Sequence, residues 1–135
     1  MKSDLLLKLA AKLEWVHATR PKEFDYSRIL HECGTPACAI GWATTIPETG
    51  LSIGGPRFVE GHGMNGYSAA RVAFGLGAEQ ALFLFEPKWV RGDMESPDWT
   101  ASAAEVANHI RRFVAEEGFG TWGPALAKAV GRVSS

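Results

Sequence analysis

The segment TASAAEVANHIRRFVAEEG, Thr100 to Gly118, decides the fold class of this chain. Its apolar residues recur at steps of three and four, the spacing that places side chains on one face of an α-helix. Thr100 or Ser102 can cap this helix at its N-terminus, and Gly118 can close it. The pattern therefore predicts an amphipathic helix that packs on a core through Val106, Ile110, Phe113 and Val114.

A second apolar stripe at the same spacing marks the start of the chain, where Ser3 can cap a helix that ends before Pro21. This stripe consists of Leu6, Leu9, Leu13 and Val16. Residues 69–74, preceded by Ser68 as a cap, and residues 78–85 predict two shorter helices on either side of a glycine turn. The apolar tail at 125–130 predicts a last short helix.

The segment from Gly50 to Gly66 interrupts the helical pattern with six glycines and predicts a small β-hairpin or extended element near residues 51–60. Within it GHGMNG, residues 61–66, matches the G-x-G-x-x-G pattern of dinucleotide sites. The dinucleotide-binding fold needs a second parallel strand after the helix that follows this motif. Residues 78–85 predict a helix where that strand should be, so we interpret GHGMNG as a glycine loop. We predict a mainly α protein, one compact domain over residues 1–135.

Charge and hydropathy exclude several classes of partner. The chain carries 14 lysines and arginines against 15 aspartates and glutamates, a net charge of −1, so we expect no nucleic-acid partner. Its apolar runs are too short or too interrupted to span a bilayer, and charges break any signal-peptide core near the N-terminus, so we expect no membrane partner. We therefore expect a cytoplasmic protein, in which thiols stay reduced.

Both cysteines lie in HECGTPACAIGWAT, residues 31–44. Thr35 and Pro36 form a favourable N-cap and N1 pair, which predicts a helix from Pro36 to about Ile46. Cys38 would then lie in the first turn, where the helix dipole lowers the pKa of a thiol.

Three interpretations of Cys38 remain open. With His31 or His62 as the base, Cys38 is a candidate nucleophile of a cysteine-dependent hydrolase or transferase. As part of the apolar pattern of its helix, Cys38 packs in the core. Together with Cys33, His31 and His62, Cys38 is a candidate zinc ligand. A paired C-x-x-C motif, which is typical of zinc sites, is missing. We therefore expect no metal and no cofactor.

Candidate binding residues fall into two groups. Cys33, Gly34 and Thr35 accompany the cysteine motif, and the glycine permits close approach of another group. Trp89 and Trp99 lie on the turn-rich segment before the last long helix, where exposed tryptophans can anchor a protein partner.

CGTPACAIG, Cys33 to Gly41, resembles a C-G-T-x-x-C-x-x-G signature of small proteins from bacteriophages and their bacterial hosts. Residues 81–87 resemble more loosely an A-x-x-L-F-x-P segment of the same proteins. The resemblance implies a helical fold and a phage or mobile-element setting, without a settled activity. We therefore expect a phage-type accessory protein that acts by protein binding, such as an inhibitor of a host or defence component. The alternative hypothesis is a cysteine-dependent enzyme, and the third hypothesis is a structural zinc module. The sequence does not indicate the oligomeric state.

Overall fold

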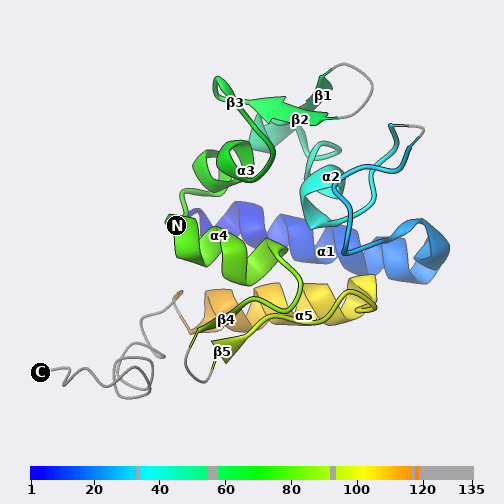
Figure 1. Cartoon of the computed structure of the whole chain (residues 1–135), viewed down its shortest axis with the longest axis vertical. Coiled ribbons are helices and arrows are strands. Elements are labelled where there is room, and N and C mark those ends of the chain that lie inside the picture. The colour runs from blue at the N-terminus through cyan, green and yellow to red at the C-terminus, as the bar shows by residue number, and fades with distance from the viewer. Residues whose placement is uncertain (33, 55–57, 92–93, 117, 119–135) are drawn as a thin grey trace, which may run out of the picture.

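The computed structural model of the chain describes residues 1–32, 34–54, 58–91, 94–116 and 118, and Figure 1 shows its arrangement. These residues form a mainly α structure with a small antiparallel sheet in the glycine-rich segment, as predicted. The helices are α1 (Ser3–Thr19), α2 (Ala39–Ala43), α3 (Gly66–Phe74), α4 (Ala78–Phe85) and α5 (Ala103–Ala115). Short 3-10 helices cover Pro21–Glu23 and Pro47–Thr49. Among the described residues no helix is long and apolar enough to cross a membrane.

Helices α1 and α5 pack side by side in opposite directions (Figure 1) and bury the two predicted stripes, except that Val114 is only half-buried. Ser102 caps α5 as expected, because its hydroxyl accepts from the Glu105 N–H while the Glu105 carboxylate accepts from the Ser102 N–H, both at 3.1 Å. An ion pair of 2.7 Å joins Arg111 of α5 to Glu14 of α1 on the surface. The buried faces carry Leu6, Leu9, Leu13, Val16, Val106, Ile110 and Phe113.

The helices predicted at residues 69–74 and 78–85 are present as α3 and α4, but some of the predicted helix caps differ from those in the structure. Lys2 rather than Ser3 is the N-cap residue of α1, and Asn65 rather than Ser68 is that of α3. Helix α3 ends at Phe74, and its C-cap residue Gly75, with a φ of +64°, starts the turn into α4. Helix α5 ends at Ala115, before the predicted Gly118, whose N–H nevertheless donates back to the Phe113 carbonyl.

The glycine-rich segment forms a three-stranded antiparallel sheet of β1 (Ser52–Gly54), β2 (Phe58–Gly61) and β3 (Met64–Asn65), in that order. His62 and Gly63 join β2 to β3 with φ values of +56° and +76°, as in a tight two-residue hairpin turn. GHGMNG is thus mostly a hairpin rather than a phosphate-binding turn. Val59, buried at the centre of the sheet, faces the helices while Phe58 is exposed.

The predicted helix from Pro36 to Ile46 is wrong at both ends. Residues 35–37 are extended, because Pro36 forms a β-bridge with Leu30 and the Ala37 N–H donates to the Ile29 carbonyl at 3.2 Å. Helix α2 therefore begins only at Ala39 and covers five residues. Pairing with the preceding segment outweighs the local capping signal.

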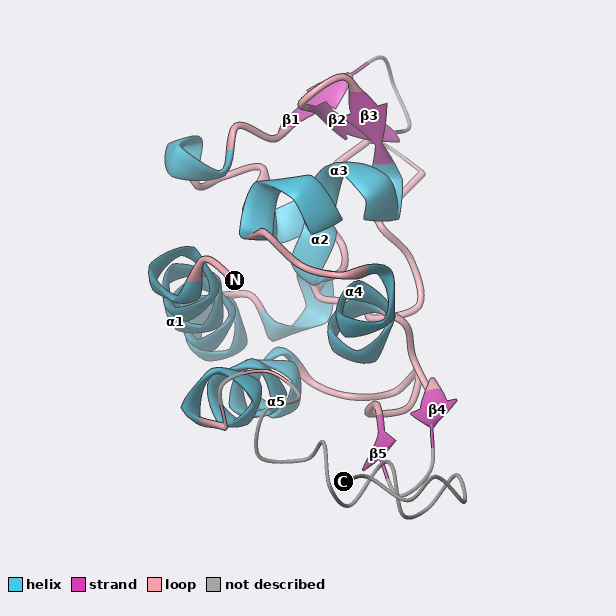
Figure 2. Ribbon diagram, turned by 90° about the vertical axis from the view of Figure 1, so that its left-hand side faces the viewer, coloured by secondary structure: helices cyan, strands magenta, loops and turns pink. Residues whose placement is uncertain are grey.

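The connection between α4 and α5 contains a second, unpredicted ladder, β4 (Val90–Arg91) paired with β5 (Met94–Glu95). Figure 2 shows it at the end of the molecule opposite the three-stranded sheet. The helix predicted at 125–130 lies outside the described residues.

Candidate functional site

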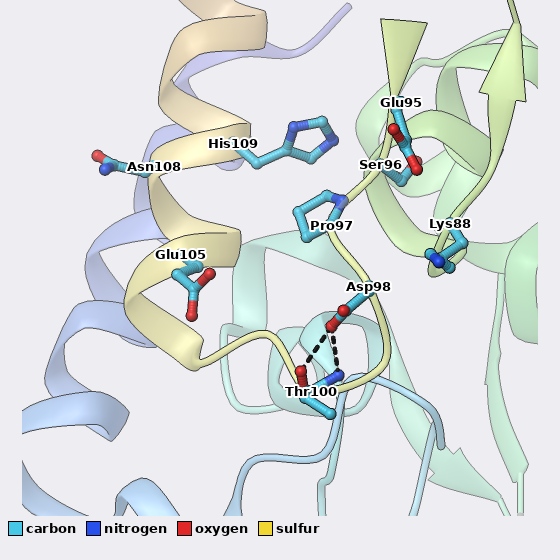
Figure 3. Close-up of a pocket in the computed structure, with 9 residues that line it drawn as sticks. All are labelled: Lys88, Glu95, Ser96, Pro97, Asp98, Thr100, Glu105, Asn108 and His109. Carbon is cyan, nitrogen blue, oxygen red and sulfur yellow. Dashed lines mark hydrogen bonds between the residues drawn. The ribbon is translucent and has the colours of Figure 1, made fainter.

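Two cavities adjoin the connection from Glu86 to Thr100, which links α4 to α5. The larger, which we call the polar cavity, has a volume of about 630 Å³ (Figure 3). The smaller, which we call the aromatic pocket, has a volume of about 300 Å³. Among the residues lining the aromatic pocket are Tyr26, Arg28, Cys38, Tyr67, Glu86 and Trp99.

Two tyrosines attach the aromatic pocket to the last turn of α4. The Tyr26 hydroxyl donates to the Leu84 carbonyl at 2.8 Å, and the Tyr67 hydroxyl donates to the Phe85 carbonyl at 3.2 Å. Carbonyls at a helix C-terminus lack partners within the helix, so these bonds satisfy groups that would otherwise need water. Burial raises the pKa of both phenols, and for Tyr67 the neighbouring Glu86 carboxylate raises it further. Both tyrosines are therefore neutral hydrogen-bond donors at ordinary pH.

Cys38 lines the same pocket as a buried, neutral thiol. It is the N-cap residue of α2 and is only 2% exposed. Burial raises the pKa of the Cys38 thiol to about 11, and this effect exceeds the opposite influence of the Gly41 and Ile40 amides. The prediction of a lowered thiol pKa was therefore wrong. It took account of the dipole at the start of the helix but not of the desolvation of the thiolate on burial.

The two histidines proposed as bases for Cys38 are held elsewhere. His31 Nε2 donates to the Glu23 carbonyl at 2.7 Å, and His62 Nε2 donates to the Thr49 carbonyl at 2.8 Å. Neither ring lines the aromatic pocket. Outside the gaps in the described chain, which include Cys33, no group of three or more histidine, cysteine or acidic side chains is arranged to hold a metal ion.

The other residues of the cysteine motif form a turn. Gly34 has a φ of +84° and its N–H donates to the His31 carbonyl at 2.8 Å. Thr35 is exposed, and its carbonyl accepts from the His31 N–H at 2.9 Å. Cys33 lies outside the described residues. Gly34 thus supplies the left-handed backbone conformation that closes this turn.

The two candidate tryptophans differ in their surroundings. Trp89 is half-buried, with its ring edge-on to that of Phe83 at 6.1 Å between centroids. Trp99 is 56% exposed and lines the aromatic pocket, and the Lys88 ammonium lies 5.6 Å from the centroid of its ring. The structure therefore brings together Cys38 and Trp99, which sequence reasoning had treated as separate candidates.

The polar cavity contains a serine and a histidine that the sequence analysis did not select. Figure 3 shows His109 projecting from α5 toward the segment that carries Ser96. The Ser96 hydroxyl and His109 Nε2 each bond to the Phe83 carbonyl, both at 2.7 Å. Because the two side chains donate to one backbone carbonyl and not to each other, they fix this connection to α4 rather than form a nucleophile and base.

His109 predicts a pH dependence of stability. Burial lowers the pKa of His109 below its ordinary value of 6.5, so the unfolded chain takes up the proton first as the pH falls. The free energy of unfolding should be highest above pH 6.5 and should decrease below it, by at most about 1.4 kcal/mol per pH unit from this group. Urea unfolding at a series of pH values measures the decrease.

The matched variants for this test are His109→Gln, whose amide can still donate to the Phe83 carbonyl, and His17→Gln at an exposed position of α1. His109→Gln should flatten the stability curve below pH 6.5, while His17→Gln should keep the wild-type slope. Equal slopes for wild type and His109→Gln would contradict the prediction.

No protein-family model, curated protein or solved structure matches the chain. The interpretation of the site therefore rests on its own geometry.

Proposed function

We propose that this chain is an accessory protein that acts by binding another protein, and that the aromatic pocket with Trp99 at its mouth is the contact site. The observation that carries the proposal is the 56% exposure of Trp99 beside a pocket with aromatic walls. Tryptophan is enriched among the residues that dominate binding energy, because it buries a large area with few rotatable bonds. Val90, on the same connection, is 58% exposed and can extend the contact.

The residues of the aromatic pocket favour a role in binding over a role in covalent catalysis. The hydroxyls of Tyr26 and Tyr67 attach the pocket wall to α4, so the pocket exists before a partner arrives. The Cys38 thiol beside them is buried and neutral, and neither candidate histidine shares the pocket. A preformed recess with an exposed aromatic rim suits the side chain of a partner.

The setting of the protein is also part of this proposal. The resemblance of residues 33–41 to a signature of phage and host proteins supports a role in a phage or mobile element. Cys38 is a free thiol, which fits a reducing cytoplasm. The partner we propose is a host or defence component whose activity the bound protein blocks.

Trp99→Ala tests the proposal, with Trp15→Ala as its matched control. Both tryptophans are exposed, Trp99 by 56% and Trp15 by 43%, but Trp15 lies on α1 beneath Lys12 and Arg20. The tagged chain captures partners from lysate of its host, and the affinity of each variant for the purified partner is then measured by calorimetry. Trp99→Ala should weaken binding by about 30-fold or more, the effect of losing roughly 2 kcal/mol at a hot spot.

Trp15→Ala should bind the purified partner about as tightly as wild type. Thermal unfolding checks that both variants are folded. Wild-type affinity in Trp99→Ala would overturn the proposal, as would equal losses in the two variants.

A further inference from the structure

Glu86 places a carboxylate on the wall of the aromatic pocket at the C-terminal end of α4. It is the half-buried C-cap residue of this helix, and its N–H donates to the Leu82 carbonyl at 2.8 Å. A helix C-terminus carries partial negative charge, so a second negative group is disfavoured there. Glu86 forms no ion pair with any residue that the structure describes. Among the described residues, the Glu86 carboxylate on this wall of the pocket therefore has no cationic partner.

Aromatic residues line the pocket together with this carboxylate. Tyr67 and Trp99 line the pocket with Glu86, and the Tyr67 hydroxyl, which donates to the Phe85 carbonyl, also interacts with the Glu86 carboxylate as a neutral group. The faces of aromatic rings attract cations, most strongly where water is partly excluded. A carboxylate among aromatic rings is therefore suited to an ammonium or guanidinium group.

The cations that the structure describes near the pocket have other partners than Glu86. Arg28 lines the pocket, but its Nε lies 3.6 Å from the Asp25 carboxylate. Lys88 lies over the Trp99 ring, but it lines the polar cavity and not the aromatic pocket. The position of Lys88 illustrates that the Trp99 ring accepts a cation, and the same ring lines the pocket that holds Glu86.

We infer that the aromatic pocket receives a lysine or arginine side chain of the bound protein, with Glu86 as its counter-ion and Trp99 as its aromatic cover. The inference rests on the proposed function and specifies the chemistry of the partner. The volume of about 300 Å³ lies at the low end of the range for small-molecule sites, which fits one side chain better than a larger ligand.

Blocked amino acids test the inference without the partner. N-acetyl-lysine methylamide and N-acetyl-arginine methylamide supply the cation, and N-acetyl-norleucine methylamide supplies the aliphatic chain of lysine without its ammonium group. Titration is followed by the NMR shift of the Trp99 indole N–H, assigned with Trp99→Ala. The two cationic probes should shift this signal in a saturable way, and the norleucine probe should bind at least about tenfold more weakly.

Glu86→Gln removes the charge and keeps the shape, and it should weaken the cationic probes about five- to tenfold. Glu95→Gln is the control, since Glu95 belongs to the same connection but lines the polar cavity. Rising salt concentration should weaken the wild-type interaction with the cationic probes, which tests the ion pair even if Glu86→Gln is poorly folded.

Equal binding of the lysine and norleucine probes, no saturable shift with any probe, or equal losses in Glu86→Gln and Glu95→Gln would overturn the inference. Protein binding through Trp99 would survive each of those results if Trp99→Ala still lost the purified partner. If Trp99→Ala and Trp15→Ala instead bound the purified partner with equal affinity, the proposed function would be overturned, whichever blocked amino acids bind.

Discussion

Gly41→Ala should destabilise the protein by about 3 kcal/mol or more, a very large effect for the addition of one methyl group. A Cβ at position 41 would lie 2.2 Å from the Ile29 carbonyl oxygen and 3.1 Å from the Cα of Pro36. Both are backbone atoms, so no side-chain rotation relieves the clash. Helix α2 would have to move away from the segment on which it packs. The free energy of unfolding in urea measures the cost.

Gly63→Ala is the matched control for this experiment. Gly63 has a φ of +76°, but a Cβ there would meet nothing within 4 Å. Its substitution should therefore cost only the backbone strain, about 1 kcal/mol. If Gly41→Ala unfolded at the same urea concentration as Gly63→Ala, the close approach of α2 to residues 29–36 would be refuted.

The two glycines of CGTPACAIG are thus required for different structural reasons. Gly34 supplies a positive φ in the turn after His31, and Gly41 allows two backbones to approach closely. The sequence alone suggests such roles for a glycine, but it does not show which backbone lies opposite. That information comes from the pairing of Leu30 with Pro36.

The long helices were predictable because each repeats one signal over several turns. In α5 the apolar period and the Ser102 cap coincide, and both are present in the structure. Helix α2 covers only five residues, so its limits depend on contacts rather than on propensity. Thr35 and Pro36 are a sound capping pair, but the bridge to Leu30 places them in extended backbone instead.

The candidate site was predictable only in part. Cys38 and Trp99 were selected separately, and no spacing in the sequence indicates that they share a pocket. Tyr26 and Tyr67 were not selected, since their roles depend on where α4 ends. Glu86 did leave a signal, because an acidic residue at the C-terminus of a predicted helix opposes the helix dipole and requires an explanation.

Cys38 in the folded protein should react with iodoacetamide at least about tenfold more slowly than in the unfolded chain at pH 7.5. Burial raises the pKa of the thiol from 9.0 to about 11, which reduces the thiolate about 100-fold at this pH. The higher intrinsic nucleophilicity of a more basic thiolate recovers roughly tenfold at most. Because the residue is only 2% exposed, limited access slows the reaction further.

Mass spectrometry of the Cys38 peptide measures the reaction over time, and the same chain in urea provides the reference rate. The rate in urea should reach half of its maximum near pH 9 and then level off, whereas the rate in the folded protein should keep rising, because only the thiolate reacts and the folded state holds the thiol pKa near 11. Rapid alkylation of folded Cys38 at mildly acidic pH would contradict the prediction. It would identify an activated thiol and favour a cysteine-dependent enzyme over the packing and binding role argued above.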